Sequence, residues 1–158
     1  RNTEKIAKLR KYNLAYDLLL FPKHLNVACE LVRKFPEQTF VLDHIAKPPI
    51  KEGKFKPWDT DIRKLASFRN VSCKISGMVT EADWQRWKPE NFKPYMDIVL
   101  EAFGTERLMI GSDWPLCTLA GDYQEVIRIV DNYFRDLSQD EQAEIWHENP
   151  RTLYGIFI

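Results

Sequence analysis

An acidic residue, Asp113, lies where the apolar run of the segment RLMIGSDWPL (residues 107–116) passes into Gly-Ser-Asp-Trp-Pro. Strands that only pack usually end in turn sequences such as Asn-Gly or Asp-Gly, whereas this one places a carboxylate at its end. Such a carboxylate can deprotonate a water molecule or bind a metal ion. Met109 and Gly111 share its face of the expected strand, and Gly111 would leave room near the acid. The alternative is that Asp113 only caps the turn that follows.

Two adjacent polar residues, Asp43 and His44, follow the apolar run FVL in the segment TFVLDHIAKPP (39–49), which ends at Pro48-Pro49. Strand alternation places His44 on the face of Leu42 and Asp43 on the face of Val41, so only one of the two can point into a pocket. We favour an inward His44, because a neutral imidazole can bind a metal ion or polarise a carbonyl group. Asp43 would then anchor a neighbouring loop. The alternative is a half-buried His44 without a chemical role.

A lysine and an aspartate occupy comparable places in two further segments. In NVSCKISG (70–77), alternation puts Lys74 on an unusually polar face. An inward Lys74 needs a carboxylate or an anionic substrate group, because a lone buried ammonium is costly. A structural ion pair would explain it equally well. Asp17, in LAYDLLLF (14–21), is either an inward polar partner, for instance of Lys74, or a contact that faces a helix.

Helical patterns follow each of these segments. We expect strands in the four apolar segments and helices at residues 25–35, 59–68, 94–103, 122–134 and from 138 onward. Gly104 should end the third helix, and Ser138 with Glu141 forms a capping box that opens the last one. That last helix should end before Pro150. Thr80 with Asp83 also resembles a capping signal.

Strands that alternate with helices predict a parallel α/β sheet. The strand-end residues Asp17, His44, Lys74 and Asp113 are separated by 27, 30 and 39 residues. A (β/α)₈ barrel allots about 31 residues to each unit, so the spacing fits a barrel and, nearly as well, a doubly wound sheet. Four units make only half a barrel. The opening RNTEKIAKLRK (1–11) is typical of a helix interior, so we expect a fragment.

The composition limits the class of partner. The 158 residues are 44% hydrophobic, which suits one domain over residues 1–158. The 23 basic and 23 acidic residues balance, so neither a nucleic acid nor a membrane is expected, and a small uncharged substrate or a protein partner suits the chain better. Three widely spaced cysteines favour reduced thiols and a cytoplasmic location.

Three motifs in this order resemble those of the amidohydrolase-related family that includes the sugar lactonases and 2-pyrone-4,6-dicarboxylate lactonase. They are FVLDHIAKPPI (40–50), NVSCKISGMVTEADW (70–84) and RLMIGSDWPL (107–116). The stretch from Tyr16 to His44 and the ending NPRTLYGI also fit. The resemblance therefore covers nearly the whole chain.

The resemblance implies a TIM barrel of amidohydrolase type, of which this chain supplies about the last four βα units. It implies that Asp113 is the general base, that His44 polarises a lactone carbonyl or helps to bind a metal, and that Lys74 and Trp114 line the pocket. We add Asp17 to the candidate substrate-binding residues. Members of the family differ in their need for zinc, so a zinc ion held by His44 and Asp113 is one of two possibilities.

The family's His-x-His motif on the first barrel strand is absent from these 158 residues. Without it, we expect this chain alone to be inactive or nearly so. The leading hypothesis is a hydrolase that opens a sugar-derived or related lactone. The alternatives are a zinc-dependent decarboxylase or amide hydrolase of the same superfamily, and a non-catalytic half-barrel. Such a half-barrel would expose strand edges and could form a homo-oligomer.

Overall fold

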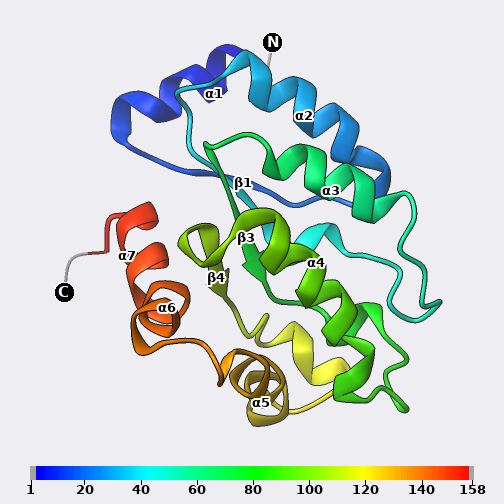
Figure 1. The fold of residues 1–158 in the computed structure, drawn as a ribbon. Helices are drawn as coiled ribbons and strands as arrows, with labels where there is room; N and C mark the ends of the chain where they lie inside the picture. Colours follow the sequence, from blue (N-terminus) through cyan, green and yellow to red (C-terminus); the bar gives the residue numbers. More distant parts are fainter. Residues whose placement is uncertain (1–2, 157–158) are drawn as a thin grey trace.

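A four-stranded parallel sheet forms the centre of the computed structural model, which describes residues 3–156 (Figure 1). Its strands are β1 (Tyr16–Leu18), β2 (Phe40–Leu42), β3 (Val71–Ile75) and β4 (Leu108–Ile110). They lie side by side in the order of the sequence, and every neighbouring pair is parallel. A doubly wound sheet reverses its strand order at one point, whereas barrel strands follow one another. The prediction of an α/β half-barrel is therefore confirmed.

Helices lie between and around the strands in the predicted places. They are α1 (Thr3–Leu9), α2 (Leu25–Lys34), α3 (Trp58–Ala66), α4 (Lys93–Phe103), α5 (Tyr123–Phe134), α6 (Gln139–Ala143) and α7 (Asn149–Tyr154). In Figure 1, α2, α3 and α4 form a continuous layer, whereas α6 and α7 lie across the strands from α2 and α3. Among the described helices, none is long and apolar enough to cross a lipid bilayer.

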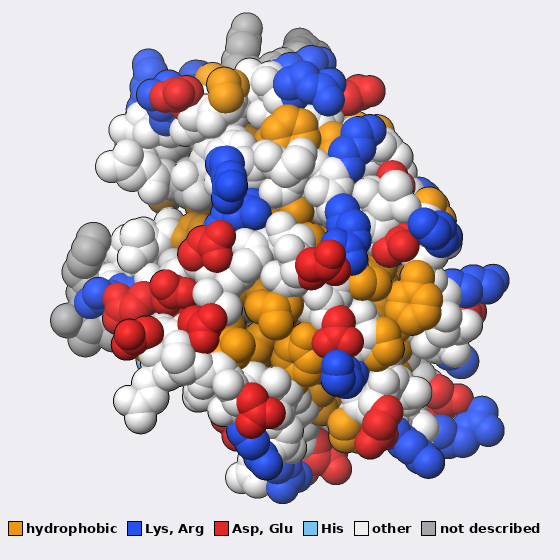
Figure 2. Space-filling model, viewed as in Figure 1, with side chains coloured by type: hydrophobic (Ala, Val, Ile, Leu, Met, Phe, Trp, Pro, Cys, Tyr) orange, Lys and Arg blue, Asp and Glu red, His pale blue; other side chains and the backbone are white. Residues whose placement is uncertain are grey.

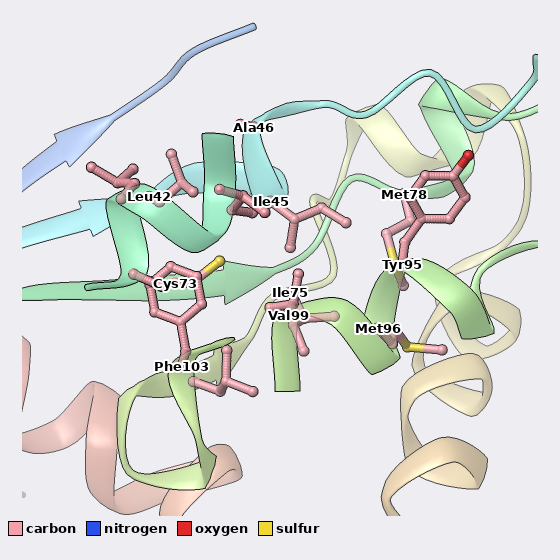
Figure 3. Close-up of a cluster of buried hydrophobic side chains, with 14 of the residues drawn as sticks. Leu42, Ile45, Ala46, Cys73, Ile75, Met78, Tyr95, Met96, Val99 and Phe103 are labelled. Carbon is pink, nitrogen blue, oxygen red and sulfur yellow. The ribbon is translucent and has the colours of Figure 1, made fainter. Parts of the chain in front are cut away.

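The side of the sheet that faces α2–α4 is apolar, and it forms the core. The strand register aligns Leu42 with Cys73 and Cys73 with Leu108, and all three are buried. Figure 3 shows these strands packing against α4 through Val99 and Phe103. Burial of each large apolar side chain contributes about 1.5–3 kcal/mol, so this side supplies most of the stabilisation.

The opposite side of the sheet is mixed in character, and we call it the inner face. The register aligns Asp17 with Val41, Val41 with Ser72, and Lys74 with Met109. In a barrel this side points toward the axis, and the carboxyl ends of its strands form the ligand-binding edge. The strands thus place Asp17 and Lys74 on the side where barrel enzymes bind their ligands.

On the side of the molecule shown in Figure 2, basic and acidic side chains are interspersed, so neither charge predominates. Hydrophobic side chains are exposed between them. This distribution agrees with the zero net charge of the sequence.

Two predictions about helix ends were wrong. The last helical region does not end before Pro150, because a π-helical segment, Glu144–Glu148, leads directly into α7. Pro150 lies in the first turn of α7, where a missing N–H group costs little. Thr80 does not start an α-helix, and it lies in a short 3₁₀ turn, Val79–Glu81. The capping box of Ser138 and Glu141 is confirmed.

Candidate active site

The chain makes a left-handed turn directly after β2. Four consecutive residues without glycine have positive φ angles: His44 (52°), Ile45 (44°), Ala46 (59°) and Lys47 (51°). This conformation costs about 1–2 kcal/mol per residue, so the surroundings must stabilise it. Ile45 and Ala46 are fully buried, and the indole N–H of Trp58 donates a buried hydrogen bond of 2.8 Å to the carbonyl of Ile45. Core packing therefore holds the turn.

The turn changes where the two polar residues point. Alternation continues one residue past β2, so Asp43 lies on the inner face like Val41. The left-handed turn then brings His44 to the same side. There the His44 ring lies 2.8 Å (Nδ1) from the hydroxyl of Ser76, and Asp43 accepts a hydrogen bond from Lys74. The prediction that only one of the two could face the site was wrong, as was the expected role of Asp43 as a loop anchor.

His44 and Asp113 meet at the carboxyl edge of the sheet. His44 Nε2 lies 3.7 Å from Asp113 Oδ1, and the two side chains are 16% and 12% exposed. Asp113 has a positive φ of 58°, in the left-handed region. Its Oδ2 is buried and has no hydrogen-bond partner among the described residues. A buried carboxylate oxygen without a partner is costly, and such atoms are typical of functional sites.

Glycine makes room for this pair, at a position that the sequence analysis missed. A Cβ atom at Gly77 would lie 2.8 Å from His44 Nδ1 and 3.1 Å from Asp113 Oδ2, and Gly77 has a φ of 62°. Gly111 was expected to leave the space, but a Cβ there would meet Ser76 at 3.2 Å instead. The glycine that ends the β3 segment is the signal that could have identified the position.

His44 is held in its neutral form. Burial lowers the pKa of His44, and this effect outweighs the opposing attraction of Asp113 and Asp43. A neutral imidazole presents one N–H group and one lone pair. If Ser76 donates its hydroxyl hydrogen to Nδ1, the ring N–H is at Nε2, toward Asp113. The reverse arrangement leaves Nε2 with a lone pair.

Lys74 belongs to a chain of charges on the inner face. Its Nζ donates to Asp43 Oδ1 at 2.6 Å and lies 3.7 Å from Asp17 Oδ2. Burial by itself would lower the pKa of Lys74, but the hydrogen bond and charge of Asp43 outweigh it and raise the pKa. Lys74 therefore stays protonated, and the carboxylates of Asp43 and Asp17 neutralise its charge. This agrees with the structural ion pair that the sequence analysis offered as one interpretation of Lys74.

The C-terminal helix adds a residue that the sequence did not point to. The hydroxyl of Tyr154 donates to Asp17 Oδ1 at 2.9 Å, and its ring centre lies 5.6 Å from Lys74 Nζ. Burial is the main cause that raises the pKa of Tyr154 to about 12. No local motif marks Tyr154, because its partner is 137 positions away. Trp114, by contrast, is 67% exposed at the rim beside Asp113.

A metal ion would need ligands in addition to those described. Residues 3–156 contain no group of three or more histidine, cysteine or acidic side chains placed to hold a metal. His44 and Asp113 have the donor types that zinc accepts, and the unpartnered Asp113 Oδ2 suits such a contact. Catalytic zinc sites use about three protein ligands, so this pair fits as part of a site. The three cysteines are buried and unpaired, as expected for apolar packing.

Comparisons with known proteins agree with the barrel geometry. The family model for amidohydrolases matches residues 3–156. An L-fucono-1,5-lactonase of Burkholderia multivorans is 34% identical over an alignment 161 residues long, which covers 96% of this chain and 54% of the relative. A second L-fucono-1,5-lactonase, of Burkholderia ambifaria, is 40% identical over 120 residues, 75% of this chain and 40% of its own length. The chain spans about half the length of the curated relatives it matches.

Solved structures give the same result. A Burkholderia multivorans amidohydrolase with bound zinc has a TM-score of 0.91 and 34% identity, over 97% of this chain and 56% of that one. A candidate 2-pyrone-4,6-dicarboxylic acid hydrolase from Pseudomonas putida has a TM-score of 0.76 and 20% identity, over 94% of this chain and 54% of that one. At that identity the second likeness concerns the fold alone.

Proposed function

The chain belongs to the amidohydrolase family, and from this premise we propose that it forms the carboxyl-terminal half of a barrel enzyme that opens a sugar-derived or related lactone with water. The observation that carries the proposal is the His44–Asp113 pair, with Nε2 and Oδ1 3.7 Å apart and Asp113 Oδ2 buried without a partner. The L-fucono-1,5-lactonases at 34% and 40% identity support a lactone as the substrate class.

Asp113 is the general base in this proposal. Its carboxylate accepts a proton from a water molecule while the water oxygen forms a bond to the lactone carbonyl carbon. The tetrahedral intermediate then collapses, the ring C–O bond breaks, and the proton passes to the leaving alkoxide. The product is a hydroxy acid. The Asp113 side chain is only 12% exposed, and this burial would strengthen the interaction of the carboxylate with a water molecule bound there.

His44 stabilises the charge that develops on the carbonyl oxygen. With its hydrogen on Nε2, a neutral imidazole donates a hydrogen bond where this charge appears. Ser76, which is 2.8 Å from Nδ1, fixes the ring orientation. Lys74, held between Asp43 and Asp17, orients the substrate through its remaining N–H groups.

A zinc ion remains compatible with the same residues. His44 and Asp113 would hold it together with ligands from outside this chain, and it would polarise the carbonyl group as a Lewis acid. Residues 1–158 supply only part of the site. We therefore expect this chain alone to hydrolyse lactones slowly or not at all.

A lactone-hydrolysis screen of the whole protein that contains this chain tests the proposal. The screen includes neutral sugar lactones and 2-pyrone-4,6-dicarboxylate, each with added zinc and with a chelator. Asp113→Asn keeps the shape of the side chain but removes the base, and we expect it to lower kcat by about 100-fold or more. Asp131→Asn, an exposed acid on α5, is the matched control and should leave kcat unchanged.

The outcomes separate the alternatives. Hydrolysis that is lost in Asp113→Asn and kept in Asp131→Asn supports the role of Asp113, and the chelator arm decides whether zinc is needed. A folded protein that hydrolyses no lactone contradicts the proposal, and assays of decarboxylation and amide hydrolysis then follow. The 158-residue chain, assayed alone, shows whether half a barrel is active or only associates with itself.

A further inference from the structure

A hollow lies at the carboxyl edge of the sheet, and we call it the rim pocket. It has a volume of about 800 Å³ and opens between the segments that follow β1, β2 and β3. Its lining includes Lys47 and Glu81, the pair of Asp83 and Arg86, and the ring of Trp84.

The rim pocket adjoins the candidate active site through two short segments. Lys47 is the last residue of the left-handed turn that begins at His44. On the other wall, the Thr80 hydroxyl donates a hydrogen bond of 2.9 Å to the carbonyl of Gly77, the glycine beside His44 and Asp113. The rim pocket and the His44–Asp113 pair are therefore linked through the left-handed turn and through the Thr80–Gly77 hydrogen bond.

The charged residues of the rim pocket neutralise one another. Lys47 Nζ lies 2.9 Å from Glu81 Oε1, and these side chains are only 15% and 23% exposed. Arg86 pairs with Asp83 at 2.9 Å, and its guanidinium is the first cause that lowers the pKa of the Asp83 carboxyl. The two other charged lining residues are Lys51 and Glu52, which have opposite signs. An anionic ligand would have to displace a carboxylate from its cation, which is unfavourable.

Neutral hydroxyl groups fit such paired charges. An ammonium group has three N–H donors and a carboxylate about four acceptor sites, so one ion pair leaves several of them unused. A hydroxyl group can accept from the lysine and donate to the glutamate without breaking their contact. The rim pocket thus favours a ligand with several hydroxyl groups over one with carboxylates.

Trp84 adds an apolar wall. Its indole N–H donates to the carbonyl of Thr80 at 2.9 Å, which fixes the ring, yet 49% of the residue is exposed. A fixed aromatic ring with an open surface can pack against the C–H groups of a saturated ring. This combination of a flat apolar wall and paired polar groups suits a carbohydrate.

We propose that the rim pocket binds the hydroxylated substituents of a neutral lactone and that Trp84 is the specificity-determining residue. This inference rests on the proposed lactone hydrolysis, which it makes more specific. It places the carbonyl group at His44 and Asp113, and the hydroxylated end of the same molecule between Lys47 and Trp84.

The test compares the whole protein with Trp84→Ala, Trp84→Phe and a control, Tyr12→Ala, in which an aromatic residue that is 73% exposed before β1 is removed. Values of kcat/KM are measured for a neutral sugar δ-lactone, for unsubstituted δ-valerolactone and for 2-pyrone-4,6-dicarboxylate. Binding of an unreactive neutral sugar δ-lactam is measured by calorimetry. This last arm does not depend on hydrolysis.

We expect Trp84→Ala to lower kcat/KM for the sugar lactone, and the affinity for the lactam, by about tenfold. The value for δ-valerolactone should change by less than about twofold, because this substrate has no groups to place in the rim pocket. Trp84→Phe should retain most of the activity, and Tyr12→Ala all of it.

Equal losses on both lactones, or no loss on either, would overturn the assignment of Trp84. A higher kcat/KM for 2-pyrone-4,6-dicarboxylate than for the sugar lactone would overturn the neutral-ligand inference. If the protein hydrolyses no lactone but binds the lactam in a Trp84-dependent manner, the rim pocket stands and the proposed hydrolysis fails. Absence of lactam binding to the unsubstituted protein would also overturn the rim pocket.

Discussion

The two sides of the sheet are built from the same strands but differ in their packing and in their role. The side that faces α2–α4 is apolar and regular, and its buried residues follow strand and helix periodicity. The carboxyl edge of the inner face contains a four-residue left-handed turn, paired charges and a carboxylate oxygen without a partner. Unfavourable features of this kind persist where a well-packed neighbour holds them, and they are typical of functional sites.

Phe103→Ala tests the apolar side and should have the largest effect on stability. Phe103 is 1% exposed and packs between α4 and the sheet (Figure 3). Loss of the ring leaves a cavity, so we expect the free energy of unfolding to fall by about 3–5 kcal/mol. Urea unfolding measures the change. A decrease below about 1 kcal/mol would mean that this side does not dominate the stability.

Lys74→Met tests the charged side. The change leaves Asp43, only 15% exposed, without its cation, so we expect a loss of about 2 kcal/mol in the same measurement. Lys93→Met is the matched control, because Lys93 pairs with Asp97 on the surface of α4, where both side chains are about half exposed or more. That pair should contribute less than about 1 kcal/mol. Equal losses would show that the inner face does not strengthen its ion pair.

Trp58→Phe tests the contact between the two sides. The change keeps most of the buried ring but removes the hydrogen bond to the carbonyl of Ile45. We expect stability to fall by about 1–2 kcal/mol, since a buried carbonyl then lacks a donor. In the whole protein, kcat should fall more than KM rises, because the left-handed turn that positions His44 is loosened. An unchanged kcat would mean that His44 keeps its place without this bond.

The sequence predicted the apolar side almost completely. The strands and the helices α2 to α5 begin and end within a few residues of the expected positions, because periodicity and glycine or proline breaks are local signals. Asp17 and Lys74 were correctly paired as an option for the same reason, since alternation places both on the inner face.

The carboxyl edge was harder to predict, because its geometry depends on contacts that are distant in sequence. Nothing in DHIAK (43–47) marks a left-handed turn, since the residue that stabilises it, Trp58, lies on another element. Gly77 and Tyr154 act on residues 33 and 137 positions away, respectively. Pro150 shows the same limit, because a π-helical segment accommodates a residue that normally ends a helix.

The pH dependence of stability provides the subtlest test of the comparison. Burial lowers the pKa of His44 below its ordinary value of 6.5, so the unfolded chain binds a proton at a higher pH than the folded chain does. The His44 contribution to stability is therefore present above pH 6.5 and is lost as the pH falls from there through the lowered pKa. His44→Asn should remove this part of the slope, because asparagine does not titrate and tolerates the left-handed turn. His147→Gln, at an exposed histidine, should leave the slope in place. If instead the slope disappears in His147→Gln and persists in His44→Asn, the carboxyl edge of the sheet does not hold His44 in its neutral form.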